Sequence, residues 1–83
     1  MTKFEDIVAA MEREPNSIRF ADLKHVCDAA FGPARVHGSH HFYRVPWKGA
    51  PLVNIQDRDG KAKGYQVRQV LQALRKLQEG SDG

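Results

Sequence analysis

The sequence predicts a small α+β domain in which helices cover one face of a three-stranded antiparallel sheet. A chain of 83 residues holds one domain with a modest core, and its 41% hydrophobic and 28% charged residues are typical of a folded protein. Apolar residues recur at helical spacing in three segments, two early and one late in the chain. Between the second and third segments the spacing changes to the alternation of strands. The predicted order is therefore α, α, β, β, β, α, with a meander as the simplest sheet topology.

Two helices are expected before residue 32. Residues 3–14 form the first, because apolar side chains repeat at i, i+3, i+4 and i+7 and because Thr2 and Glu5 make a capping box. Pro15 ends this helix. The second runs from Phe20 to Phe31, where a glycine followed by a proline closes it.

The remaining elements follow from turn residues and from a second change of period. Strands are expected at residues 35–37, 42–45 and 52–56, and a glycine-serine pair joins the first two. Prolines and glycines keep residues 46–51 irregular, and residues 57–60 are rich in turn formers. The last helix has apolar side chains at helical spacing: Val67, Val70, Leu71, Leu74 and Leu77.

Cysteine usage and the chain start indicate a cytoplasmic protein. The single cysteine, Cys27, cannot form an internal disulfide, and its apolar helical position predicts a core thiol. The N-terminus turns acidic at once and has no apolar leader, and no apolar stretch approaches the roughly 18 residues that span a bilayer. We therefore expect neither export nor a membrane partner.

The formal charge of +3 hides an asymmetry along the chain. Residues 1–34 include four basic and six acidic residues, which gives a charge of −2. Residues 35–76 include nine basic and two acidic residues, which gives a charge of +7. A positive field concentrated on part of a small domain attracts a polyanion, most commonly nucleic acid.

Three of the four histidines lie within five positions, in the string His37-Gly38-Ser39-His40-His41. The ordinary pKa of histidine, about 6.5, lets this side chain give and take protons at neutral pH, so the cluster contains candidate general acids or bases. The intervening glycine and serine would let a phosphate approach the loop amides. Two other interpretations remain: solvated surface histidines, or a zinc site completed by His41 or Cys27.

A basic segment leads into the last helix. Lys61, Lys63 and Arg68 lie near its N-terminus, and Gly60 and Gly64 permit close approach of a ligand, which predicts a phosphate cradle. A solvated basic turn is the alternative interpretation.

Aromatic and basic residues are also interleaved in the middle of the chain. Phe42, Tyr43 and Trp47 lie among Arg44 and Lys48, a combination that could stack on unpaired bases while contacting phosphates. Strand alternation puts Phe42 and Tyr43 on opposite faces, so one belongs to the core, and the pattern does not decide which.

Three strings occur in order along the chain: GSHHFYR from Gly38, LVNIQ from Leu52 and GKAKGYQVRQVL from Gly60. In this combination the chain resembles, over about residues 20–77, the HicA family of toxins, which are small messenger-RNA interferases of type II toxin–antitoxin pairs. The resemblance implies an α-β-β-β-α fold like that of double-stranded-RNA-binding domains. It also implies a single HicA-like domain over residues 1–83, with an N-terminal helix extension at 1–17, a core at 18–79 and a flexible tail at 80–83.

The resemblance further implies the chemistry and the partners. The family cleaves RNA without the ribosome, a metal or another cofactor, and uses the histidine that follows the glycine-serine pair, which here is His40. Candidates to assist proton transfer are His41, Tyr43 and His37, and a single-histidine mechanism with water as the other partner is the alternative. A HicB-like antitoxin that covers His40 and the basic face is the expected protein partner. The residues expected to bind RNA and its phosphates are Gly38, Ser39, Arg44, Lys61, Lys63 and Arg68.

Two questions stay open at this point. A non-catalytic RNA-binding module with the same fold is the alternative function. The helix at residues 3–14 exceeds the compact core of the family, and it could pack on the sheet, extend a dimer or contact the antitoxin.

Overall fold

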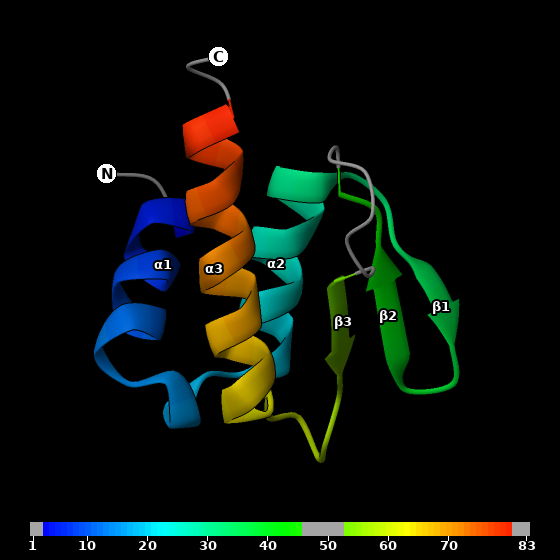
Figure 1. The fold of residues 1–83 in the computed structure, drawn as a ribbon. Helices are drawn as coiled ribbons and strands as arrows, with labels where there is room; N and C mark the ends of the chain where they lie inside the picture. The colour runs from blue at the N-terminus through cyan, green and yellow to red at the C-terminus, as the bar shows by residue number, and fades with distance from the viewer. Residues whose placement is uncertain (1–2, 46–52, 81–83) are drawn as a thin grey trace.

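The computed structural model describes residues 3–45 and 53–80, whose elements follow the expected order (Figure 1). The helices are α1 (Lys3–Arg13), α2 (Phe20–Phe31) and α3 (Gly64–Gly80), and a short 3-10 helix, η1 (Pro15–Ser17), follows α1. The strands β1 (Arg35–His37), β2 (His40–Tyr43) and β3 (Val53–Gln56) form one antiparallel sheet in the order β1-β2-β3. The predicted α+β class and the predicted meander are therefore confirmed.

The helices lie on one face of the sheet. α2 and α3 contact β3, while α1 contacts α2, α3 and η1. Figure 1 shows α1 beyond the other two helices as seen from the sheet. α1 thus packs on the helical layer, an arrangement that differs from packing on the sheet, while a dimer contact and an antitoxin contact stay predictions.

The core combines side chains from every layer. Ile7 and Met11 bring α1 into it, and the thiol of Cys27 is buried, as its helical position predicts. The buried apolar side chains of the described residues are Ile7, Met11, Ile18, Phe20, Leu23, Val26, Cys27, Tyr43, Val53, Ile55, Ala62, Val67, Val70 and Ala73.

The strand register decides which side chains face the helices. His41 pairs with the fully buried Ile55, and Tyr43 pairs with Val53, so these positions form the inner face of the sheet. Of the two aromatics on β2, Tyr43 is therefore the one in the core. The alternate positions lie on the face that the helices leave uncovered, which we call the open face: Arg35, His37, His40, Phe42, Asn54 and Gln56.

Two boundaries differ from the sequence prediction. β2 begins at His40 and ends at Tyr43 instead of spanning residues 42–45, because the turn is only two residues long and His37 already pairs with His40. Gly38 has a φ of 60°, which suits glycine at the first central position of a tight hairpin turn. α3 begins at Gly64, before its first apolar position, and extends through Gly80, one residue into the predicted tail.

Several predicted features lie outside the described residues. These are Thr2 of the capping box, the irregular segment 46–51 with Trp47 and Lys48, and the tail at 81–83.

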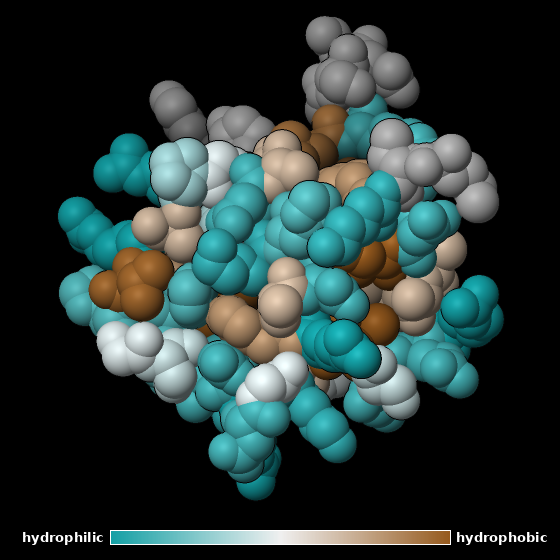
Figure 2. Space-filling view, turned by 180° about the vertical axis from the view of Figure 1, so that it is seen from behind, coloured by the Kyte–Doolittle hydropathy of each residue, from teal (hydrophilic) through white to brown (hydrophobic). Residues whose placement is uncertain are grey.

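The surface is mainly hydrophilic on the side seen in Figure 2, where hydrophobic side chains are exposed in a few separate places. Val36 and Tyr65 are the large hydrophobic residues that are most exposed among those described, each at 54%. Within residues 3–45 and 53–80, no helix combines the length and the apolar character needed to cross a membrane.

Candidate functional site

His40 occupies the start of β2 on the open face of the sheet. Its Nδ1 lies 3.5 Å from Oδ1 of Asn54 on β3. Its ring stacks on Phe42 two residues later, with the ring centroids 6.0 Å apart and an interplanar angle of 17°. The imidazole is thus contacted from two directions and stays partly exposed.

His37 lies directly across the strand pair from His40 and shares its face. Opposite residues of an antiparallel pair have Cβ atoms about 4.5–5.5 Å apart, which is close enough for two imidazoles to act on one substrate group. The ring of His37 meets Phe42 edge-on, with centroids 6.0 Å apart at 67°. We call His37, His40 and Phe42 the ring cluster.

The loop from β3 to α3 is fixed next to this cluster by backbone hydrogen bonds. The amide of Asp57 donates to the carbonyl oxygen of Ser39 at 3.1 Å, which joins the loop to the turn that precedes His40. On its other side, the amide of Phe20 donates to the carbonyl oxygen of Gly60 at 2.9 Å. The histidine string and the predicted phosphate cradle therefore lie at the same end of the sheet.

Lys61 and Lys63 lie in this loop just before α3. They line a shallow hollow of about 540 Å³, together with Arg58, Asp59, Ala62, Gly64 and Tyr65. We call it the basic hollow. The first amides of an α-helix lack intrahelical acceptors and favour anions, so the position before α3 suits a phosphate group.

Two of the residues expected to assist catalysis lie on the inner face, away from the ring cluster. The hydroxyl of Tyr43 donates to Oδ1 of Asp28 at 2.7 Å, and burial together with this bond raises the pKa of Tyr43. The ring of His41 packs against Phe20, with centroids 4.9 Å apart, and its buried Nδ1 has no hydrogen-bond partner among the described residues. Of the three candidate helpers, only His37 shares the open face with His40.

Two predicted phosphate contacts are also separated from His40. Arg44 follows the other end of β2 and lines a second hollow, of about 520 Å³, with Arg35 and Phe42. Arg68 is two residues after Gln66, whose Oε1 accepts a hydrogen bond from the amide of Gln56 on β3. Two helical residues correspond to a rotation of about 200°, so Arg68 lies on the side of α3 away from the sheet.

The alternative zinc site is not assembled in this structure. His37 and His40 share the open face, but His41 points to the inner face and Cys27 is in the core. Burial raises the pKa of Cys27 to about 12, with Asp28 as a second cause. Across residues 3–45 and 53–80, no three potential ligands from histidine, cysteine, aspartate and glutamate gather as a metal site would require.

Sequence reasoning missed two residues that organise the site. Asn54 contacts His40, and Asp28 binds both Tyr43 and Lys24, whose Nζ lies 2.8 Å from Asp28 Oδ2. The contact of Asn54 with His40 can be inferred only when the register of β2 on β3 is known. Asp28 is one helical turn after Lys24, so their pairing was readable from the sequence, although the contact with Tyr43 was not.

The Tyr43–Asp28 contact predicts a pH-dependent stability. Burial alone would raise the pKa of Asp28, but hydrogen bonds from Lys24 and Tyr43 outweigh it and hold the pKa below the usual 3.8. We expect Tyr43→Phe to lower the free energy of unfolding by about 1–2 kcal/mol at pH 7. As the pH falls, Asp28 is protonated in the unfolded chain before it is protonated in the folded chain. The difference in stability between wild type and Tyr43→Phe is therefore complete well above pH 4 and shrinks as the pH falls through the lowered pKa of Asp28.

Urea unfolding of both proteins at pH 7 and at about pH 3 measures this effect. Tyr65→Phe is the matched control, because Tyr65 is 54% exposed and its hydroxyl accepts only a 3.3 Å bond from Gln66 Nε2. A difference between wild type and Tyr43→Phe that stays constant over this pH range would show that Asp28 is not the responsible group.

Comparison of the chain with models of protein families, with curated proteins and with solved structures found no significant match.

Proposed function

We propose that this protein is a HicA-like toxin, an endoribonuclease that cleaves messenger RNA by histidine acid–base catalysis and is neutralised by a HicB-like antitoxin. One observation carries the proposal. His40 lies on the uncovered face of the sheet beside His37, and the loop with Lys61 and Lys63 is hydrogen-bonded to the turn before it. The candidate proton carriers and the candidate phosphate-binding cations thus lie at the same end of the sheet.

The contact with Asn54 suits His40 to the role of general base. An amide oxygen only accepts hydrogen bonds, so the contact favours the tautomer of His40 with its hydrogen on Nδ1, and in that neutral tautomer Nε2 keeps its lone pair. In the proposed reaction, Nε2 removes the proton from a ribose 2′-hydroxyl, and the 2′-oxygen attacks the adjacent phosphorus. Asn54 is then a positioning residue for this step.

The leaving group also requires a proton. When the bond between phosphorus and the 5′-oxygen breaks, protonated His37 donates to that oxygen, while His40 holds the proton of the 2′-hydroxyl. The products are a 2′,3′-cyclic phosphate and a 5′-hydroxyl end, and one proton is taken for each one given. His37 is therefore the proposed general acid. His41 and Tyr43 do not suit this role because their side chains lie on the inner face of the sheet.

Charge and stacking supply the binding of the substrate. Lys61 and Lys63 neutralise a phosphate near the start of α3, and Arg35 and Arg44 contact the backbone at the other end of β2. Phe42 lines the same hollow as Arg35 and Arg44 and stacks on His40, and it offers a surface on which an unpaired base can stack. The preferred substrate is therefore single-stranded RNA, since its bases are free to stack.

The proposed family also accounts for the layout. The elements α2, β1, β2, β3 and α3 correspond to the α-β-β-β-α order of a domain like the double-stranded-RNA-binding domain, and α1 is an addition before it. An antitoxin that covers the open face would block His40 and the RNA path together. Inhibition then needs no change in the conformation of the toxin.

The experiment that tests the proposal is incubation of the purified protein with a messenger-RNA fragment in the presence of a chelator. We expect cleavage products with 2′,3′-cyclic phosphate and 5′-hydroxyl ends. Binding that weakens steeply with salt but gives no products after long incubation would establish the non-catalytic RNA-binding module instead. Cleavage that needs an added divalent cation would overturn the histidine mechanism.

A further inference from the structure

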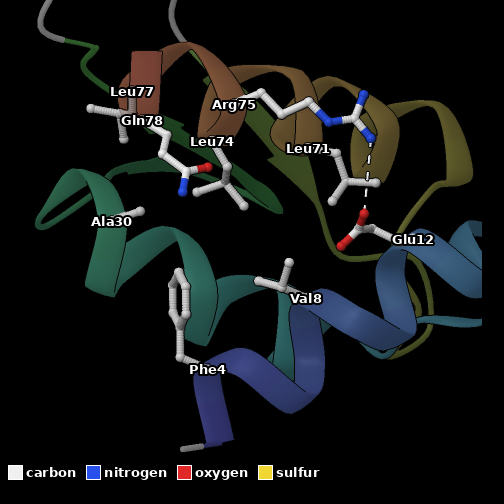
Figure 3. A pocket seen from close by; sticks show the side chains of 9 residues that line it. All are labelled: Phe4, Val8, Glu12, Ala30, Leu71, Leu74, Arg75, Leu77 and Gln78. Atoms are coloured by element: carbon white, nitrogen blue, oxygen red, sulfur yellow. Dashed lines mark ion pairs between the residues drawn. The ribbon is translucent and has the colours of Figure 1, made fainter. Parts of the chain in front are cut away.

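A groove separates α1 from α3 in the helical layer. It has a volume of about 500 Å³, and Ala30 near the end of α2 closes it. Figure 3 shows Phe4 and Val8 of α1 facing Leu71 and Leu74 of α3 across the groove. These four apolar side chains are only partly buried within the chain, so a partner could cover the rest of their surface.

The two walls of the groove carry opposite charges. Among the residues that line the groove, Glu12 is the charged residue on α1, and Arg75 is the charged residue on α3. Glu12 and Arg75 meet across the groove, with Oε2 and Nη2 3.9 Å apart (Figure 3). Their side chains are 55% and 67% exposed, so both charges can also reach a second molecule.

This arrangement makes the groove complementary to a copy of itself. α1 and α3 run antiparallel (Figure 1), and a two-fold axis along the groove lays α1 of one chain on α3 of the other. Glu12 of each chain then faces Arg75 of its partner, and apolar residues face apolar residues. A two-fold axis across the groove would instead lay α1 on α1 and α3 on α3, so Glu12 would not meet Arg75 of the partner.

We propose that the chain forms a symmetric homodimer through this groove. An unrelated helix would have to present an acidic edge and a basic edge in matching order, whereas a second copy does so by symmetry. α1 lies beyond α2 and α3 as seen from the sheet (Figure 1), and no described residue that lines the groove belongs to the open face, so this dimer does not use the open face. The dimer goes beyond the proposed function and does not depend on it.

Charge reversal tests the interface without disturbing the core. By multi-angle light scattering at about 100 μM and low salt, we expect a mass twice the 9.4 kDa of one chain. Glu12→Arg gives four positive groups at the contact and Arg75→Glu gives four negative ones. Each variant should weaken dimerisation about 100-fold or more and give monomers, because like charges at an interface cost several kcal/mol.

Mixing the two variants separates the interface from the ion pair within one chain. In a mixed dimer, the two positive side chains of the Glu12→Arg chain meet the two negative side chains of the Arg75→Glu chain, so an equimolar mixture should regain the dimer mass. An ion pair that acts only within each chain is broken in both variants, and mixing cannot repair it. Circular dichroism verifies that both variants are folded.

Asp6→Arg is the matched control, since Asp6 is on α1 but about 200° around the helix from Phe4, and it should stay dimeric. A wild-type chain that is monomeric at about 1 mM would overturn the proposal. So would single variants that remain dimeric, or folded variants whose mixture stays monomeric. RNA cleavage is not part of this readout, so failure of the dimer and failure of the nuclease assignment are distinguishable.

Discussion

Replacing His40 by alanine is expected to reduce RNA cleavage by about 100- to 10,000-fold, the range that one positioned acid or base supplies. The side chain is partly exposed, and its contacts are a 3.5 Å approach to Asn54 and a stack on Phe42, so the fold should tolerate its loss. The measurement is kcat/KM on a defined RNA, with circular dichroism and thermal unfolding of the same sample. In bacterial cells, we expect the wild-type chain to arrest growth and the same substitution to relieve that arrest.

The histidines of this chain provide their own controls. His25→Ala removes an exposed side chain on α2 and should leave cleavage unchanged. His37→Ala should lower kcat, because the proposed mechanism then lacks the group that gives a proton to the leaving 5′-oxygen. A folded His40→Ala protein that cleaves as fast as wild type would contradict the proposed mechanism.

The helices were predictable because their signals are local. Apolar spacing, Pro15 and the glycine-proline pair after Phe31 fix α1 and α2 to within one residue. The start of β2 was placed two residues late, since alternation alone does not reveal that pairing begins at once after a two-residue turn. The boundaries of strands depend on hydrogen bonds between strands, and the sequence of one strand alone does not determine these bonds.

In the candidate site, too, the sequence predicted features with local signals and did not predict those that depend on contacts between distant residues. The sequence pointed to His40, Lys61 and Lys63, which the fold brings to one end of the sheet through the bond between Asp57 and Ser39. It did not decide whether Phe42 or Tyr43 faces the core, because each face of β2 carries one aromatic residue. Asp28 on α2 accepts the Tyr43 hydroxyl and so satisfies it in the core, a contact between residues 15 positions apart. Tyr43 therefore stabilises the fold beneath the site, and His41 packs against Phe20 on the same inner face.

The largest expected effect on stability comes from Met11→Ala in α1. Met11 is fully buried, and truncation of a core methionine to alanine costs about 2–5 kcal/mol. Natural domains have about 5–15 kcal/mol in total, and a chain of 83 residues belongs near the lower end. We therefore expect the melting temperature to fall by more than about 10 °C, which thermal unfolding by circular dichroism measures.

Two variants of the same helix distinguish a core role from a loss of helix propensity. Met11→Leu nearly conserves volume and should cost less than about 1.5 kcal/mol, while the exposed Arg13→Ala should stay within about 0.5 kcal/mol of wild type. Alanine is the best helix former, so a large loss in Met11→Ala can only come from the cavity it leaves against α2 and α3. If Met11→Ala were as stable as Arg13→Ala, α1 would not contribute to the hydrophobic core. Because α1 also forms one wall of the dimer groove, the same result would remove the basis for that interface.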